Sequence, residues 1–133
     1  MSHPFDESIR LDPTAAGAWA GATHPAYANM IGPYGGTTCA VLLQAVLLHA
    51  ARQGDPIALT VNYAAPIADG SYEVQAQPLR TNRSTQHWAM QLTQGGQLCA
   101  SGTAVLALRR PTWSAPEAEP PVGMPPALEL PRA

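Results

Sequence analysis

The stretch that most constrains the fold of this chain is IGPYGGTTCAVLLQAVLLHAA, residues 31–51. The spacing predicts a helix that begins near Gly36 and ends near Arg52, with Gly54 and a proline just beyond it as stop signals. A helix that is apolar on every side has to be buried. Here the apolar residues surround the helix instead of following one stripe, since they occupy positions 39–43, 45–48, 50 and 51. The rest of the chain therefore has to wrap around this helix.

The segments after the helix alternate between apolar and polar residues with the period of two that is typical of half-buried strands. We predict four antiparallel strands, at 57–63, 71–80, 87–94 and 98–110. Before the helix we expect a short strand at 8–12 and an irregular loop at 23–36. These elements predict an α+β fold in which one curled antiparallel β-sheet wraps one long buried helix. A single sheet covers only about half of a helix, so we expect a second copy of the domain, or a related domain, to cover the rest.

The same alternation assigns side chains to one face of each predicted strand. One face of the first strand should carry Ile57, Leu59, Val61 and Tyr63. The inward residues expected from the next two strands are Tyr72, Val74, Ala76, Trp88, Met90 and Leu92. Cys39 in the helix and Cys99 in the last strand are expected to be free, buried thiols.

The composition excludes several classes of protein. Charged residues make up 12% of the 133 residues, and the seven basic residues are all arginines without a marked cluster, so nucleic acid is not an expected partner. The amino-terminal MSHPFDES has neither the basic nor the apolar region of a signal peptide. The apolar run is shorter than the ~20 residues that cross a bilayer. We expect one soluble, cytoplasmic domain without membrane contact, followed by a proline-rich segment at 111–133.

The glycine pair Gly35-Gly36 at the start of the helix has two interpretations. The first turn of a helix presents unpaired N–H groups with a partial positive charge, and glycines let another molecule come close to them. Such amides stabilise a carbonyl oxygen that becomes an oxyanion during acyl transfer. Alternatively, the pair only turns the chain tightly into the helix. Both interpretations stay open at this point.

Four segments, taken in order, resemble a hot-dog domain, and more narrowly the N-terminal half of the acyl-CoA thioesterase II-like family. They are NMIGPYGG at 29–36, ALTVNYAAPIADG at 58–70, LRTNRST at 79–85 and QGGQLCASGTAVL at 94–106. The resemblance implies that residues 1–110 form one hot-dog domain, in which the sheet wraps the helix. It also implies that acyl-CoA binds between two such units, which would supply the missing cover for the helix.

Two departures from that family bear on function. Family members usually carry two hot-dog domains on one chain, so residues 111–133 resemble either a tail or the linker to a second domain. Hot-dog thioesterases also commonly place an Asp or Glu on the helix, or near it, as base or nucleophile. At that place this chain has Leu43 and Gln44, and its nearest acid, Asp55, lies beyond the predicted helix. His24, in the loop before the helix, is either a base or a solvated residue.

The resemblance implies a site at the start of the helix. The amides of Gly36 and Thr37 would hold the oxyanion, and Gly35 and Thr38 would lie against the substrate. The alternative for the two threonines is a structural one, in which their hydroxyls cap the helix.

The other candidate residues are polar groups that each have a structural alternative. Gln44 would orient water or the thioester carbonyl across the pair of domains, or else bond to backbone. Asn29 would donate to a carbonyl near the helix start, or else shape a turn. Arg80, Asn82 and Arg83 would bind the phosphates of CoA, or else form a solvated turn.

The sequence thus predicts an acyl-CoA thioesterase that hydrolyses an acyl-CoA to a carboxylic acid and CoA, as a homo-oligomer or paired with a second hot-dog domain. The missing carboxylate leaves an alternative, a non-catalytic acyl-CoA-binding half that completes the site of a partner. A hot-dog dehydratase or hydratase would need a histidine and an acid together near the helix, and the sequence shows no such pair. Phosphate-binding loops, catalytic-triad order and metal-ligand spacing are lacking, so neither a cofactor nor a metal is expected.

Overall fold

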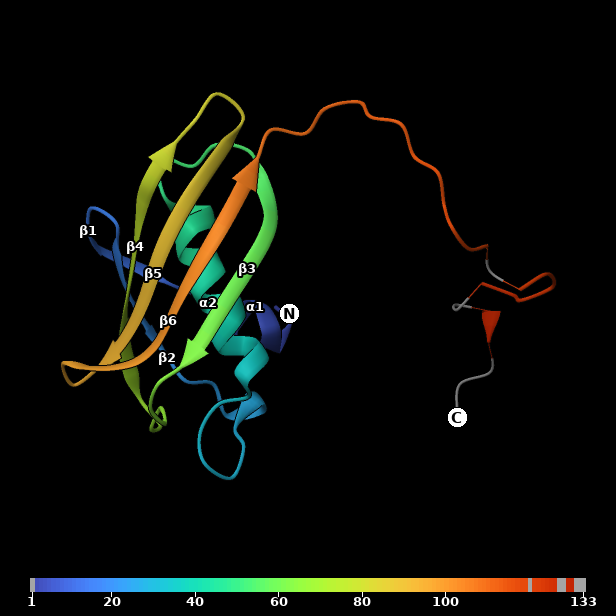
Figure 1. The fold of residues 1–133 in the computed structure, drawn as a ribbon. Coiled ribbons are helices and arrows are strands. Elements are labelled where there is room, and N and C mark those ends of the chain that lie inside the picture. The colour runs from blue at the N-terminus through green and yellow to red at the C-terminus, as the bar shows by residue number, and fades with distance from the viewer. Residues whose placement is uncertain (1, 120, 127–128, 131–133) are drawn as a thin grey trace.

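The computed structural model describes residues 2–119, 121–126 and 129–130 (Figure 1). The first part of the chain contains three helices and two strands, and four consecutive strands follow within the described residues. In chain order the elements are α1 (Pro4–Ser8), β1 (Asp12–Ala15), β2 (Ala18–Ala22), η1 (Pro25–Tyr27), α2 (Gly35–Leu48), β3 (Asp55–Tyr63), β4 (Ser71–Thr81), β5 (Thr85–Gln94) and β6 (Gln97–Ala107). None of the helices within the described residues has the length and apolar character that crossing a bilayer requires.

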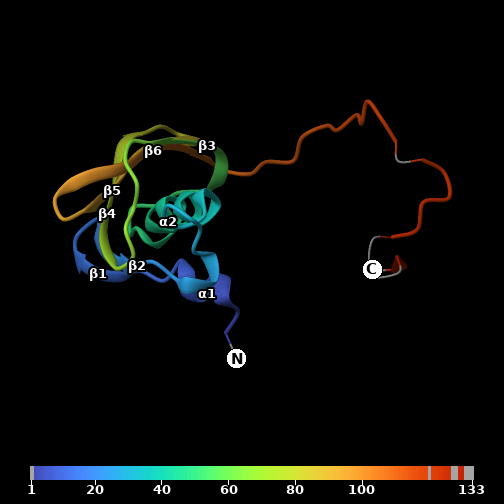
Figure 2. The same cartoon turned by 90° about the horizontal axis from the view of Figure 1, so that it is seen from below.

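The six strands form one antiparallel sheet in the order β1-β2-β4-β5-β6-β3. The sheet curls around α2, which the view along the helix makes plain (Figure 2). β5 and β6 are joined by Gly95 and Gly96, whose positive φ angles of 57° and 78° suit a tight hairpin turn. The prediction of an α+β fold, with one long helix wrapped by one curled antiparallel sheet, is confirmed.

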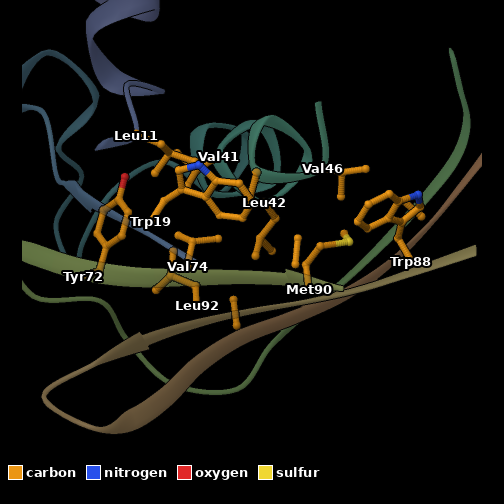
Figure 3. Close-up of a cluster of buried hydrophobic side chains, with 14 of the residues drawn as sticks. Leu11, Trp19, Val41, Leu42, Val46, Tyr72, Val74, Trp88, Met90 and Leu92 are labelled. Carbon is orange, nitrogen blue, oxygen red and sulfur yellow. The ribbon is translucent and has the colours of Figure 1, made fainter. Parts of the chain in front are cut away.

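The core lies between α2 and the inner faces of β4 and β5 (Figure 3). Alternate residues of both strands point into it, as their period of two predicted. The predicted inward residues Tyr72, Val74, Ala76, Trp88, Met90 and Leu92 are all buried. Each large apolar side chain contributes roughly 1.5–3 kcal/mol by leaving water. α2 contributes Val41, Leu42, Ala45 and Val46 to the same cluster.

The amino-terminal prediction is wrong in two respects. Instead of a strand at 8–12, the chain forms the short helix α1, capped by the His3 ring, whose Nδ1 accepts from the Phe5 N–H at 3.1 Å. Strand β2 was not predicted at all, because AWAGA consists of small residues around one large side chain. That side chain, Trp19, is buried, and β2 pairs with β4 along its length.

Helix α2 ends at Leu48, four residues before the predicted end at Arg52. His49 stops it, since its backbone is extended and its ring Nδ1 accepts from the N–H of Ala51 at 3.0 Å. The ring also packs edge-on against Trp88, with 4.8 Å between the centroids. His49 is therefore a structural residue that fixes the turn after the helix.

Gln86 ties that turn to the sheet through a buried amide. Its Oε1 accepts from the N–H of Gln53 at 2.9 Å and from Trp88 Nε1 at 2.9 Å. Its Nε2 donates to the carbonyl of Ala51 at 2.9 Å and to Thr81 Oγ1 at 2.9 Å. Gln86 is 1% exposed, so its amide has to find its hydrogen bonds within the protein. Trp88 is buried as well, so its Nε1 depends on Gln86 for a hydrogen bond.

A single chain leaves part of α2 uncovered. Cys39, Leu43 and Leu47 of α2 are only partly buried, although the opposite side of the helix is fully enclosed. Leu59 and Tyr63 of β3 face the same interior side of the sheet, since they pair with Ala104 and Ala100, which are buried in the core, yet Leu59 and Tyr63 are 36% and 55% exposed. We call Cys39, Leu43, Leu47, Leu59 and Tyr63 the open face.

Gln86→Ala is expected to lower the free energy of unfolding by about 1–3 kcal/mol, because it leaves the buried Trp88 Nε1 without a hydrogen-bond partner. Urea denaturation with an unchanged m-value would measure the loss. Gln91→Ala is the matched control, since Gln91 is a glutamine of the same strand, β5, and its side chain is exposed on the outer face of the sheet. We expect that control to change stability by less than about 0.5 kcal/mol. Equal effects of the two changes would contradict the structural role of Gln86.

Candidate functional site

A cavity of about 420 Å³ lies at the amino-terminal end of α2. Its volume falls within the range typical of small-molecule sites. Its walls are formed by the loop before α2, the first turn of α2, the end of β3 and the β3–β4 connection. All of these segments are among the residues that the structure describes. Neither a charged side chain nor a histidine lines it. The lining residues are Asn29, Met30, Ile31, Gly32, Pro33, Gly35, Thr38, Tyr63, Ala64, Ala65, Pro66 and Ile67.

The glycine pair is needed for close contact, not for an unusual backbone. Neither Gly35 nor Gly36 has a positive φ. A Cβ on Gly35 would lie 3.1 Å from Tyr63 Oη and 3.3 Å from its Cζ. A Cβ on Gly36 would collide with the ring of Tyr34. Each glycine therefore makes room for a tyrosine ring at the first turn of the helix.

The first turn of α2 keeps two amides free within the part of the chain that the structure describes. The N–H groups of Thr37 and Thr38 both donate to the carbonyl of Tyr34, at 3.0 and 3.4 Å, so these amides are engaged within the helix. The amides of Gly35 and Gly36 form no hydrogen bond with another described residue. Gly36 is exposed and does not line the cavity, whereas Gly35 is half-buried and lines it. Both amides belong to the unpaired N–H groups at the start of a helix, which can bind a ligand.

The two threonines do not cap the helix, contrary to the structural alternative drawn from the sequence. The N-cap residue is Tyr34, which provides no side-chain capping bond. The Thr37 hydroxyl donates to the Tyr34 carbonyl at 2.6 Å, and Thr37 is buried. Thr38 is also buried but lines the cavity with part of its surface.

Tyr63 is a feature of the site that the sequence did not single out. Its Oη donates to the carbonyl of Gly35 at 2.6 Å and lies 2.9 Å from Cys39 Sγ. Burial of the hydroxyl, followed by the hydrogen bond with Cys39, raises the pKa of Tyr63 to about 12. The phenol therefore stays protonated, and remains a hydrogen-bond donor, across the neutral pH range.

The structure separates Gln44 from Asn29. Asn29 lines the cavity, and its Oδ1 accepts from the Met30 N–H at 2.7 Å, which leaves its Nδ2 available as a donor. Gln44 does not line the cavity, since it lies nine residues, or about 13 Å along the axis, beyond the start of α2. It sits half-buried next to Leu43 of the open face and forms no hydrogen bond with a described residue.

Arg80, Asn82 and Arg83 lie at the opposite end of the domain, at the β4–β5 hairpin (Figure 1). Arg80 is near the end of β4, and Asn82 and Arg83 are in the turn. Asn82 shapes this turn, because its backbone N–H donates to the carbonyl of Thr85 at 2.8 Å and its Nδ2 donates to Thr85 Oγ1 at 3.1 Å. Arg80 Nε donates to Asn82 Oδ1 at 2.8 Å. Within one chain these residues are therefore not brought together with the cavity.

The histidine and acid considered from the sequence both have structural partners. His24 Nδ1 accepts from the Ala26 N–H at 3.2 Å, and its Nε2 lies 3.3 Å from Glu7 Oε2, so both ring nitrogens are engaged outside the cavity. Asp55 pairs with Arg52 at 3.3 Å at the far end of the domain. The cavity thus offers donors for an oxyanion but no general base of its own.

A family model described as the acyl-CoA thioesterase N-terminal domain matches residues 24–107. The chain is also similar to a protein of unknown function with a hot-dog fold from Alicyclobacillus acidocaldarius, at 40% identity and a TM-score of 0.88. That match covers 98% of this chain and 49% of the other. The hot-dog fold implied by the sequence resemblance is therefore confirmed.

Two further structures have the same fold at lower identity. A protein from Thermobifida fusca proposed to be a thioesterase II is 22% identical, with a TM-score of 0.78 over 92% of this chain and 46% of the other. The tesB protein of Mycobacterium avium subspecies paratuberculosis is 17% identical, with a TM-score of 0.74 over 90% and 48%. This chain spans about half the length of these relatives. Among curated protein sequences, none matches it.

The environment of Tyr63 predicts that its phenol ionises at a higher pH than an ordinary tyrosine. Its pKa of about 12, against an ordinary value of 10.0, means that the fold favours the neutral phenol. The hydrogen bond to Gly35 is therefore fully present below pH 10.0, and its contribution to stability is lost as the pH rises to about 12. Burial raises the pKa of Tyr72 to about 12 as well.

Tyrosinate absorbance measures this titration directly. Tyr63→Phe should remove one phenol that ionises near pH 12, and Tyr72→Phe should remove the other. A Tyr63→Phe protein that instead loses a phenol ionising near its ordinary pKa of 10.0 would contradict the hydrogen-bonded hydroxyl of Tyr63.

Proposed function

Because this chain belongs to the family of acyl-CoA thioesterase N-terminal domains, we propose that it hydrolyses an acyl-CoA thioester to a carboxylic acid and free CoA. The observation that carries the proposal is the pair of amides of Gly35 and Gly36, which form no hydrogen bond among the described residues. Gly35 lines a mainly apolar cavity, and Gly36 is the next, exposed residue of the helix. Met30, Ile31 and Ile67 give the cavity the apolar walls that suit an acyl chain.

The chemistry follows from the charge that develops during thioester hydrolysis. The oxygen of a water molecule bonds to the carbonyl carbon, and the carbonyl oxygen becomes an oxyanion. The Gly36 N–H, at the positive end of α2, would stabilise that oxygen, and Asn29 Nδ2 would be a second donor. The C–S bond then breaks, and the proton removed from water reaches the CoA sulfur. A general base has to carry that proton, and none of the cavity residues can do so.

The base is proposed to come from a second hot-dog unit packed on the open face. β3 is an edge strand of the sheet, and its residues from Ile57 to Tyr63 include no charged side chain. Uncharged edges of this length invite pairing with another strand, whereas the other edge, β1, has four residues and contains Pro13. The partly exposed apolar residues of α2 would be buried in the same step. The second unit is another copy of this chain or a further domain.

In such a pair, Gln44 and the hairpin arginines gain roles that one chain does not give them. Gln44 lies beside Leu43 of the open face, so its free amide would face the second unit and position the attacking water there. Arg80, Asn82 and Arg83 lie at the far end of the domain, so we propose that they contact the phosphates of a CoA bound at the second unit's cavity.

The alternative is a non-catalytic half that binds acyl-CoA and completes the site of a partner. The observation that favours it is the cavity lining, which holds neither a carboxylate nor a histidine. Under this alternative the chain binds acyl-CoA but does not turn it over without its partner.

Hydrolysis of a panel of acyl-CoAs, followed as loss of thioester absorbance, tests the proposed activity. Asn29→Ala is expected to lower kcat at least about 10-fold, because it removes one donor from the developing oxyanion. Gln77→Ala, an exposed amide on the outer face of β4, is the control and should keep wild-type kcat. Binding of acyl-CoA without turnover would favour the non-catalytic half, and the absence of both binding and turnover would refute both candidates.

Assembly through the open face is tested separately. Leu59→Lys places a charge on the inner side of β3 and is expected to shift the protein to smaller species in sedimentation velocity, because pairing would bury the charge. Thr103→Lys adds the same charge on the outer face of β6 and should leave assembly unchanged. A Leu59→Lys protein that assembles like the wild type would rule out this face as the interface.

A further inference from the structure

Tyr63, the last residue of β3, connects the edge of the sheet to the first turn of α2. Its Oη donates to the carbonyl of Gly35 at 2.6 Å. A phenol has a single proton, so in the second contact, at 2.9 Å, the Cys39 thiol donates and Oη accepts. One side chain therefore holds both Gly35 and the residue one helical turn beyond it.

The carbonyl of Gly35 belongs to the same peptide unit as the N–H of Gly36. This unit is planar and trans, so its C=O and N–H point in opposite directions. A hydrogen bond that fixes the Gly35 oxygen therefore also fixes the direction of the Gly36 N–H. The constraint is important here because glycine has more backbone freedom than any other residue, and two of them stand in succession.

We propose that Tyr63 is a positioning residue of the reaction, which aims the Gly36 amide at the thioester carbonyl by holding the Gly35–Gly36 peptide. The inference rests on the proposed function, in which the Gly36 amide stabilises the oxyanion. Such stabilisation is effective only when the donor is oriented before the charge develops. Tyr63 does not touch the reacting atoms in this scheme, since it acts through the backbone.

The packing around the ring explains why Gly35 accompanies Tyr63. A Cβ at Gly35 would lie 3.1 Å from Oη and 3.3 Å from Cζ, so a side chain there would press the tyrosine ring away by a few tenths of an ångström. Gly35 thus lets the tyrosine reach the backbone, and Gly36 leaves its own N–H open to the substrate. Gly35 thus contributes the carbonyl that Tyr63 holds, and Gly36 contributes the N–H of the same peptide unit.

The first test compares the amide spectra of the wild type and Tyr63→Phe by nitrogen–proton NMR. The substitution keeps the ring and removes both hydrogen bonds. We expect the resonance of the Gly36 amide to shift or broaden, whatever the activity of the protein. Tyr27→Phe is the matched control, because its ring contacts with Phe5 and His24 are retained by phenylalanine and its hydroxyl has no hydrogen-bond partner among the described residues. It should leave the Gly36 resonance in place.

The second test is kinetic. Loss of an orienting hydrogen bond predicts that Tyr63→Phe lowers kcat by about 3- to 10-fold and leaves KM within about 2-fold. Tyr27→Phe should keep both constants. A purely structural role for Tyr63 would instead lower the melting temperature without this selective loss of kcat.

The outcomes separate this inference from the proposed function. An unchanged Gly36 resonance in Tyr63→Phe overturns the inference, and so does a shifted resonance with wild-type kcat. A wild-type chain that hydrolyses no acyl-CoA overturns the proposed function. In that case the resonance alone decides, because a shift in Tyr63→Phe supports the anchoring of the peptide and no shift overturns it.

Discussion

The structure depends on the burial of one helix that has no polar side. The curled sheet encloses the part of α2 that faces β4 and β5, where Leu42 and Val46 are completely buried. It leaves the part near β3 partly exposed, because β3 is the last strand of the sheet and has no neighbour beyond it. The same incomplete cover places the cavity, since the start of α2, the end of β3 and the preceding loop meet where the sheet ends.

The local chemistry of the site follows from that arrangement. Two tyrosine rings pack onto two glycines, so the first turn of α2 has an open, oriented amide without any charged side chain nearby. Positive potential comes from the helix terminus itself. A site of this kind can stabilise an oxyanion but lacks a group that accepts a proton. The uncovered side of the helix and the missing base therefore both lead to the proposal of a second hot-dog unit.

The sequence predicted the elements whose patterns are strong and local. The apolar run located α2, and the period of two assigned Val74, Met90 and their neighbours to the core. It did not locate β2, whose small residues give no pattern, or the end of α2, which depends on the His49 side chain. The alternation placed Tyr63 on the correct face of β3. Its contact with Gly35 depends on how a strand end meets a helix start, which no local pattern encodes.

The most direct test of the proposed oxyanion site is a crystal structure with an acyl-CoA analogue in which a methylene group replaces the thioester sulfur. The resulting ketone keeps the carbonyl and resists hydrolysis. We expect its oxygen to lie within hydrogen-bonding distance of the Gly36 N–H, and a second hot-dog unit to cover the open face. A ketone bound away from the start of α2, or bound by a single unit whose open face remains in solvent, would contradict this expectation.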